Sequence, residues 1–324
     1  MPRLLRIFFH DACFDGTASA ALFSAFYRDV IDRSVEIDPV GMIHRDGDPF
    51  VDAAFDADDH ACVDFRFSAN QHMRWWFDHH ATAFQPPQLR EIFDGAKPAQ
   101  RATWCFDAKA ASCTGLLARE LERGWSWRPP PYLTEVIRWA DTIDAAAFAS
   151  AEAAVALDEP AQQVAAWLAH GRKGGETAAY IKQLSHRSIS QIAQDPEMRQ
   201  AIAQIADGRS DLRTALVHCA QQDGAVVVFD RLAVPGARSP GFLGYQLFPD
   251  AKYSIAATTS DQAIKISVGV NPWTTRYGGA SHNIGELCAA LGGGGHAVVG
   301  GITLRLDEQV RAKAAIAALV VALR

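Results

Sequence analysis

The sequence predicts a two-domain α/β protein. The expected order is a mainly parallel sheet flanked by helices, a helical connector and a smaller α/β C-terminal domain. The chain has 324 residues, which corresponds to two domains at about 100–200 residues each. Short apolar runs alternate with helix-like segments in the first part, as in α/β units. From about 144 to 206 nearly all residues favour helix, and strand-like runs return afterwards. These shifts place the domains at 1–190 and 211–324, joined by a connector at 191–210.

The first domain opens with an apolar run, Leu4 to Phe9, that is rich in branched and aromatic residues and predicts a strand. A polar turn, Asp15-Gly16-Thr17, separates it from an Ala- and Phe-rich helix over 18–27. The same criteria predict further strands at 35–40, 61–64 and 74–77, and helices at 111–123 and 132–140.

The second domain is expected to begin after Asp207-Gly208-Arg209-Ser210, which we interpret as a break in the helical connector. A helix at 284–291 and a final strand precede a closing Ala-rich helix at 308–323. Strands are predicted at 215–218, 225–229, 253–257 and 263–268.

Composition and charge exclude several classes of function. Hydrophobic residues make up 49% and charged residues 21% of the chain, which fits a soluble protein with a substantial core. The net charge of −6 argues against a surface that grips long duplex nucleic acid. No apolar run approaches the ~18–20 residues that span a membrane, and the N-terminal sequence does not resemble a secretory signal. Six scattered cysteines without a CxxC pair indicate reduced thiols, a cytoplasmic setting and no structural zinc.

Polar side chains follow three of the predicted strands. His10 follows the first strand, Asp64 a later one, and Asp78-His79-His80 the apolar run Trp75-Trp76-Phe77. Ligands of open parallel sheets bind outside the carboxyl ends of the strands, so these side chains are expected to form one site. Carboxylates and imidazoles suit Mn²⁺, and two ions about 3.5–4 Å apart can activate water for attack on phosphorus. The candidate ligands are His10, Asp11, Asp15, Asp64, Asp78, His79 and Asp141.

Each candidate also has a structural interpretation. Asp15 precedes Gly16 and could cap the first helix, and Asp141 could belong to a turn. His10 could be a half-exposed histidine, and Asp64 could hydrogen-bond a loop. The metal-site interpretation is favoured because several such residues occupy the same end of successive strands.

Four successive glycines, residues 292–295, precede His296 in the second domain. Glycines let backbone amides approach an anion closely, and His296 could donate a hydrogen bond to a phosphate. The alternative is a flexible hairpin or linker loop.

Taken together, these residues resemble the motifs of the DHH phosphoesterase superfamily, in the order of that family and over nearly the whole chain. The first-domain motifs are His10…Cys13-Phe14-Asp15-Gly16, Val63-Asp64-Phe65, Asp78-His79-His80 and Asp141; those of the DHH-associated domain are Asn283-Ile284-Gly285-Glu286-Leu287 and GGGGH at 292–296. The superfamily includes RecJ-type exonucleases, nanoRNases that also dephosphorylate pAp, cyclic-dinucleotide phosphodiesterases and family II pyrophosphatases.

The resemblance implies one or two Mn²⁺ ions, with Mg²⁺ as the alternative, and it assigns roles to individual residues. Asp64 would bridge the ions, His80 would contact the scissile phosphate, and Asp78 would orient its neighbours. The implied metal ligands are His10, Asp15, Asp64, His79 and Asp141. The implied substrate-binding residues are Gly293, Gly294, Gly295 and His296, assisted by Asn271 or Arg276.

The activity implied by the resemblance is hydrolysis of phosphodiester or phosphomonoester bonds by metal-activated water. The substrates would be small nucleotides or short oligonucleotides bound in a cleft between the domains, and the chain is compatible with a homodimer. An inorganic pyro- or polyphosphatase is the alternative enzyme. A nucleotide or metal sensor without turnover is the non-enzymatic alternative.

One position departs from the family. Most members have Asp-x-Asp in the first motif, whereas Cys13 stands two residues before Asp15, as in an HxxCxDG branch of predicted phosphohydrolases. Asp11 could replace the missing acid, Cys13 could ligate a softer metal, or the first metal position could be weak or empty. From the sequence we favour a weakened or empty position over ligation by Cys13.

Overall fold

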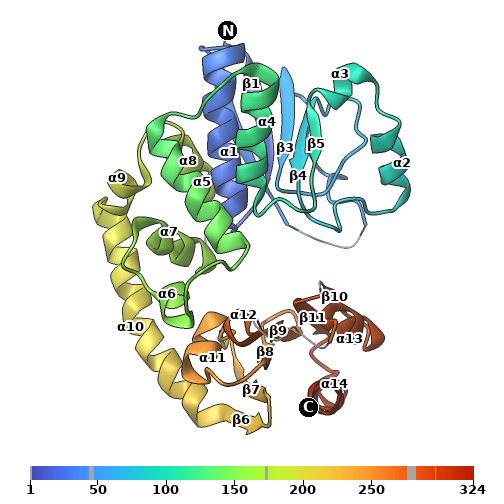
Figure 1. Ribbon diagram of the computed structural model, residues 1–324, viewed down its shortest axis with the longest axis vertical. Coiled ribbons are helices and arrows are strands. Elements are labelled where there is room, and N and C mark those ends of the chain that lie inside the picture. Colours follow the sequence, from blue (N-terminus) through green and yellow to red (C-terminus); the bar gives the residue numbers. More distant parts are fainter. Residues whose placement is uncertain (1, 44–46, 172–173, 276–281, 296) are drawn as a thin grey trace. The chain divides into compact units, whose positions relative to one another are not determined.

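The computed structural model describes residues 2–43, 47–171, 174–275, 282–295 and 297–324 (Figure 1). It divides into two compact units, each described below by itself. The first consists of Met1–Ala147 and Leu157–Ile205, and the second of Phe148–Ala156 and Ala206–Arg324. The long helix α10 (Pro196–Cys219) belongs in part to each unit and includes much of the predicted connector.

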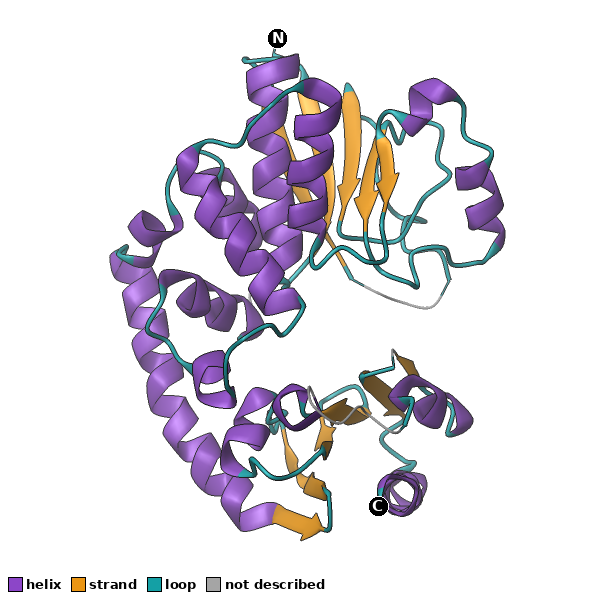
Figure 2. Ribbon diagram, viewed as in Figure 1, coloured by secondary structure: helices purple, strands orange, loops and turns teal. Residues whose placement is uncertain are grey.

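The first unit contains a five-stranded sheet in which every pair of neighbouring strands is parallel, in the order β2-β1-β3-β4-β5 (Figure 2). Four of the strands were predicted, and the short fifth one was not. The strands are β1 (Leu4–His10), β2 (Glu36–Met42), β3 (Asp59–Val63), β4 (Trp75–Asp78) and β5 (Trp104–Phe106).

Both faces of this sheet are covered, which explains why its strands are almost continuously apolar. In β4, Trp75 and Phe77 pack on the side of α1, whereas Trp76 packs on the opposite side among aromatic rings. The helices of the unit are α1 (Phe14–Phe26, continued by a π-helical turn at Tyr27–Ile31), α2 (Gln88–Asp94), α3 (Pro98–Arg101), α4 (Cys113–Trp125), α5 (Pro131–Asp144), α7 (Pro160–Ala169), α8 (Gly175–Leu184) and α9 (Ile189–Ala193).

The strand order creates a switch point between β1 and β3. The chain passes from β1 to β2 on one side and then returns to place β3 on the other side of β1. In the register of the sheet, Phe9 pairs with Val63, and Val63 pairs with Phe77. The residues that follow each of these three therefore emerge side by side at the carboxyl edge, where open α/β sheets bind ligands.

The second unit contains a six-stranded mixed sheet in the order β10-β11-β9-β8-β7-β6, in which β7 and β8 pair in parallel and the other described neighbours pair antiparallel. Its strands are β6 (Ala220–Asp223), β7 (Val226–Pro235), β8 (Tyr253–Thr259), β9 (Ile264–Val270), β10 (Gly294–Gly295) and β11 (Val299–Leu304). Its helices are α6 (Ala151–Val155), α11 (Phe242–Leu247), α12 (Pro272–Thr275), α13 (Ile284–Ala290) and α14 (Gln309–Leu323).

Two predictions about the start of this unit are wrong. The strand expected at 215–218 is the last turn of α10, and the expected break at 207–210 lies within the same helix. Leu216 is fully buried against Val227 and Phe229 of β7. The apolar residues at 215–217 therefore include the buried side of a helix and do not form a strand. Tertiary packing outweighs the local preference of a short apolar run here.

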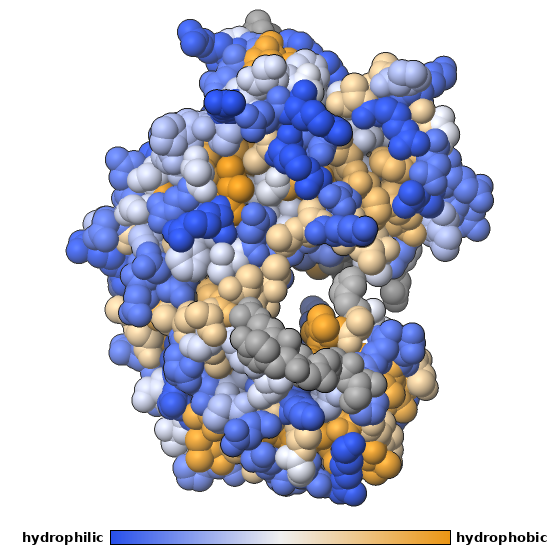
Figure 3. All heavy atoms as spheres, in the orientation of Figure 1, coloured by the Kyte–Doolittle hydropathy of each residue, from blue (hydrophilic) through white to orange (hydrophobic). Residues whose placement is uncertain are grey.

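On the face drawn in Figure 3, hydrophilic side chains cover much of the surface and hydrophobic ones lie among them. Within the described ranges, the helices are too short or too polar to cross a membrane.

Candidate metal centre

Asp64 lies at the centre of the polar cluster at the edge of the first sheet. It follows β3 directly, in the left-handed region at φ 56°, a conformation that Asp tolerates better than most residues. Its side chain is fully buried, and neither carboxylate oxygen makes a hydrogen bond within the described part of the chain. Burial, together with the nearby Asp15, raises the pKa of Asp64 well above its usual range. A carboxylate in this position is costly unless a cation compensates it.

The two oxygens of Asp64 face different imidazoles. Oδ2 lies 3.5 Å from His10 Nδ1, whereas Oδ1 lies 3.6 Å from His79 Nε2 and 3.7 Å from His80 Nδ1. These separations are longer than ordinary hydrogen bonds. Ligands held about 2.1 Å from one ion at octahedral or tetrahedral angles lie roughly 3.0–3.5 Å apart, which is close to what is observed. The two oxygens of Asp64 therefore face two different groups of potential ligand atoms.

His79 faces the same space. Its Nδ1 lies 3.1 Å from the carbonyl oxygen of Ala110 and donates a hydrogen bond to it, which turns Nε2 toward the cluster. Nε2 is buried and makes no hydrogen bond to any described residue, and it faces carboxylate oxygens of Asp144 at 3.3 Å and of Asp15 at 3.7 Å. An imidazole nitrogen that faces several carboxylate oxygens is an arrangement that suits a metal ion.

Asp78 holds the two histidines that follow it. Its Oδ1 accepts hydrogen bonds from the backbone amides of His79 (2.8 Å) and His80 (3.3 Å), and it lies 2.7 Å from His80 Nδ1. Burial alone would lower the pKa of His80, but the hydrogen bond and charge of Asp78 outweigh it, so the pKa is raised. Asp78 therefore orients His80 and favours its charged form.

Asp15 has a structural contact as well as a place in the cluster. It accepts hydrogen bonds from Cys113 N (2.7 Å), Thr114 N (2.9 Å) and Thr114 Oγ1 (2.5 Å), and so caps α4 rather than its own helix. Of these three hydrogen bonds, Oδ2 accepts the one from Cys113 N. The same oxygen faces His79. That oxygen keeps a lone pair for a cation.

The geometry selects Asp144, and not Asp141, as the partner of His79. Asp141 Oδ1 accepts a hydrogen bond from Ser112 Oγ (2.5 Å), and Ser112 in turn caps α4 by accepting from Gly115 N. Asp144 follows three residues later on α5, close to Asp15 and His79. Burial and the charge of Asp15 raise its pKa to about 6. From the sequence the role of Asp144 stayed open, because its i+3 spacing from Asp141 was the signal for it.

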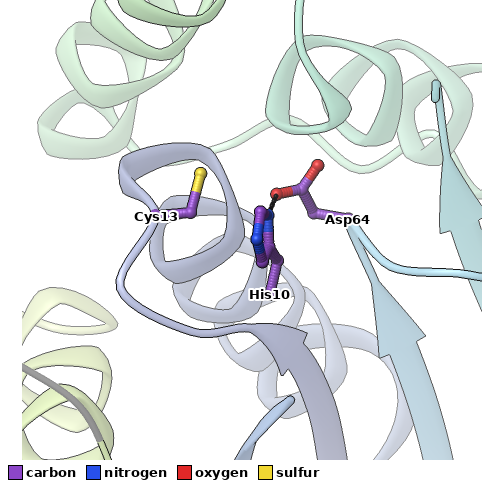
Figure 4. Close-up of side chains that lie close together, drawn as sticks. All are labelled: His10, Cys13 and Asp64. Carbon is purple, nitrogen blue, oxygen red and sulfur yellow. Dashed lines mark ion pairs between the residues drawn. The ribbon is translucent and has the colours of Figure 1, made fainter. Parts of the chain in front are cut away.

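Among the residues that the structure describes, three sets of side chains have ligand atoms within 4.8 Å of one another, and Asp64 or His79 belongs to each of them. One set includes Cys13, which lies with His10 and Asp64 (Figure 4). The sets are His10–Cys13–Asp64, Asp64–His79–His80 and Asp15–His79–Asp144.

Asp11 is occupied elsewhere. Its Oδ1 accepts from Thr177 Oγ1 and its Oδ2 from Gly174 N, each at 2.8 Å, so it anchors the start of α8. The carboxylate of Asp11 therefore holds α8 in place and does not substitute for the acid that is missing from the first motif.

The predicted substrate-binding residues lie in the second unit. The Gly294–Gly295 segment pairs with β11, and a Cβ on Gly293 would lie 2.1 Å from a backbone carbonyl oxygen, so close chain approach accounts for glycine there. Asn271 is buried, and its amide donates to the carbonyls of Pro249 and Ala251. Arg276 and His296 lie outside the described residues.

No family model and no curated protein matches the sequence. Solved structures do match the whole chain. A pGpG-specific phosphodiesterase, PggH from Vibrio cholerae, is similar with a TM-score of 0.66 and 18% identity, and the match covers 100% of both chains. A DHH-domain member of the s1p family of ribosomal proteins matches with a TM-score of 0.61 and 12% identity, covering 99% of this chain and 87% of that one.

The chain has the fold of DHH-domain proteins. RecJ from Thermus thermophilus, in complex with Mn²⁺, matches 99% of this chain with a TM-score of 0.56 and 13% identity. The chain spans about half (52%) of the length of that protein. At these identities the likeness concerns the fold, and it confirms the predicted α/β architecture with a second mixed-sheet unit.

The side chains present fit the divalent ion that the DHH fold implies. The buried oxygens of Asp64 and the buried Nε2 of His79 are the ligand types that Mn²⁺ accepts, and hydrogen bonds within the described ranges leave these atoms unused.

Proposed function

We propose that the chain is a metal-dependent phosphoesterase that hydrolyses phosphodiester or phosphomonoester bonds of small nucleotides or short oligonucleotides. The observation that carries the proposal is the carboxylate of Asp64, buried without hydrogen bonds from the described residues and flanked by imidazoles at the switch point of a DHH-type sheet. The RecJ match contains Mn²⁺, and the PggH match is a phosphodiesterase, which supports this class of chemistry.

Two positions would hold the cation. His10 and Asp64 contribute to one, and Asp64, His79, Asp15 and Asp144 contribute to the other. When bound, divalent ions would supply Lewis acidity toward phosphoryl oxygens and make water a better nucleophile. We add Asp144 to the proposed ligands because it lies with His79 and Asp15, whereas Asp141, our predicted ligand, accepts a hydrogen bond from Ser112, which caps α4.

The residues of the chain supply positioning and charge. Asp78 fixes the imidazole of His80 and favours its protonated form, so His80 would stabilise negative charge on the scissile phosphoryl group. The hydrogen bond from His79 to the Ala110 carbonyl fixes the ring that faces Asp64.

Gly293, Gly294 and Gly295, with Arg276 and His296, remain our proposed contacts for the far phosphate or nucleotide of the substrate. Asn271 would act indirectly, because its amide already holds the chain at Pro249 and Ala251. We propose pGpG as the first substrate to assay, given the substrate of the PggH match.

The test is hydrolysis by the purified full chain with Mn²⁺ or Mg²⁺, offered pGpG, a second linear dinucleotide, a cyclic dinucleotide, pAp and pyrophosphate. We expect turnover of at least one nucleotide, reduced roughly 10²–10³-fold or more in Asp64→Asn. Asp261→Asn, which changes an exposed acid between β8 and β9, is the matched control and should keep full activity.

Three other outcomes would overturn the proposal. Cleavage of pyrophosphate alone would assign an inorganic phosphatase. Nucleotide binding without turnover would assign a sensor. Full activity of Asp64→Asn would remove the metal cluster from the mechanism.

A further inference from the structure

We propose that the two metal positions prefer different ions. The position beside His10 takes a thiophilic ion such as Zn²⁺ or Fe²⁺ with the Cys13 thiolate as a ligand, and the position beside His79 takes Mn²⁺. This inference rests on the proposed function for the presence of metal, and it goes beyond it in naming the ligand and the ion.

The geometry brings three different donor atoms together. His10 ends β1, Cys13 precedes α1 and Asp64 follows β3, and their side chains converge on one space (Figure 4). The three ligand atoms all lie within 4.8 Å of one another. Asp64 provides independent support because it is fully buried and its oxygens make no hydrogen bond to described residues, while Oδ2 points to His10 at 3.5 Å.

The backbone fixes Cys13 in this position. The Cys13 carbonyl accepts hydrogen bonds from Thr17 N (3.2 Å) and Thr17 Oγ1 (3.0 Å). Gly16 packs so tightly on the end of β1 that an added Cβ would lie 2.2 Å from the carbonyl oxygen of His10. The start of α1 is thereby held against the strand that carries the His10 ligand.

Cysteine is an unusual residue at the N-cap of a helix. Cys13 is the N-cap residue of α1, and the backbone amides of Gly16 and Asp15 approach its sulfur without forming a regular capping hydrogen bond. Ser, Thr, Asp and Asn are the favoured residues at such a position, and cysteine is not among them. A role as a ligand accounts for the thiol.

The neighbouring Cys113 is a less suitable ligand. Its thiol donates a hydrogen bond to the carbonyl oxygen of Phe77 at 3.2 Å, and it belongs to none of the three ligand sets among the described residues. Cys13 is therefore the thiol that a metal at this edge would meet.

The two donor sets differ in chemical softness. His10, Cys13 and Asp64 offer nitrogen, sulfur and oxygen, whereas His79, Asp15 and Asp144 offer one nitrogen and two carboxylates. Thiolate selects ions such as Zn²⁺, and carboxylate suits Mn²⁺. Binding at the first set releases the thiol proton to solvent as the metal–sulfur bond forms. The exchange of an acid for Cys13 thus changes the preferred metal, which reverses our expectation of a weak or empty position.

The test is metal competition in the reduced full-length protein. Protein saturated with Mn²⁺ is titrated with Zn²⁺ up to one equivalent per chain, desalted and analysed for metal content, and the zinc environment is measured by X-ray absorption. We expect the first equivalent of zinc to replace one manganese and to have a sulfur neighbour about 2.3 Å away. A zinc shell that contains only nitrogen and oxygen ligands would overturn the inference.

Cys13→Asp gives the sharper comparison because it restores an oxygen ligand. We expect its bound Zn:Mn ratio to fall at least ~10-fold, as expected when a ligand in the metal shell is exchanged. Cys219→Ser, which removes a partly buried thiol near the end of α10, should leave the ratio unchanged. An unchanged ratio in Cys13→Asp, with a native circular dichroism spectrum, would contradict the inference.

These measurements do not depend on turnover. A protein that binds zinc through sulfur but hydrolyses no nucleotide would refute the proposed function and keep this inference. An active enzyme whose zinc has no sulfur neighbour would support the proposed function and refute this inference.

Discussion

Substitution of Asp64 by Asn should stabilise the metal-free protein while removing its response to metal. Asp64 is fully buried, its oxygens take no hydrogen bond from described residues, and its burial and nearby carboxylates raise its pKa. Asn keeps the shape and tolerates φ 56°, whereas most other residues would be strained there. Its neutral amide group would also face Nε2 of His79, which lies 3.6 Å from Oδ1 in the wild type.

The size of the effect follows from these contacts. Relief of a buried, uncompensated polar group is worth about 1–3 kcal/mol. For a domain of about 150–250 residues, each kcal/mol raises Tm by about 2–4 °C. We therefore expect Asp64→Asn to melt roughly 2–12 °C above wild type in EDTA.

Mn²⁺ should remove most or all of the stability advantage of Asp64→Asn over the wild type. At a Mn²⁺ concentration of about 100 times Kd, wild type gains about 2.7 kcal/mol, and the variant should gain much less because the bridging carboxylate is lost. Tryptophan fluorescence suits this measurement, since Trp75 and Trp76 are fully buried in the first unit and report its unfolding. The reasoning is refuted if Asp64→Asn is destabilised in EDTA and still responds to Mn²⁺ as wild type does. Asp261→Asn serves again as the control.

Three further predictions concern the same centre and the glycine segment. Asp144→Asn should weaken Mn²⁺ binding at least ~10-fold by titration calorimetry, whereas Asp141→Asn should mainly lower stability, by about 1 kcal/mol, through the cap of α4. Burial and Asp15 raise the pKa of Asp144 to about 6 in the metal-free protein, so the folded state binds an extra proton between about pH 4 and 6. Metal-free stability should therefore decrease as pH rises through that window, and Mn²⁺ affinity should decrease as pH falls below about 6; Asp144→Asn should flatten both profiles. Gly293→Ala should destabilise the second unit by about 1–3 kcal/mol in a melting experiment, because its Cβ would lie 2.1 Å from a carbonyl oxygen, whereas Gly294→Ala, with nothing within 4 Å, should cost less.

The part of the site that lies on strand ends could be predicted because parallel strands place their carboxyl ends at one edge. His10, Asp64 and the Asp78-His79-His80 segment each follow a recognisable apolar run, and the register of the sheet aligns them. For these residues, local sequence patterns carry the information that determines position.

The helix-borne part of the site could not be predicted in the same way. Asp141 and Asp144 share α5 one turn apart, and only the packing of α5 against α4 shows that the first meets Ser112 and the second His79. Asp11 is equally acidic and adjacent to the first strand, but its contact with Thr177 depends on a helix that is more than 160 residues away (|i−j| of 166). Such contacts are tertiary and leave no periodic trace in the sequence.

Two short segments were not predicted correctly from the sequence for a related reason. Strand β5 has three residues, too few to show alternation, and the segment at 215–218 is apolar because α10 buries Leu216. Both depend on neighbouring elements more than on their own composition.

We propose that Asp64 bridges divalent cations at the carboxyl ends of β1, β3 and β4. Anomalous scattering from crystals of the reduced protein supplied with Mn²⁺ and Zn²⁺, collected at both metal edges, tests this most directly. We expect two peaks on opposite sides of the Asp64 carboxylate, with zinc on the side of His10 and Cys13 and manganese on the side of His79. No peak within bonding distance of Asp64 would contradict it.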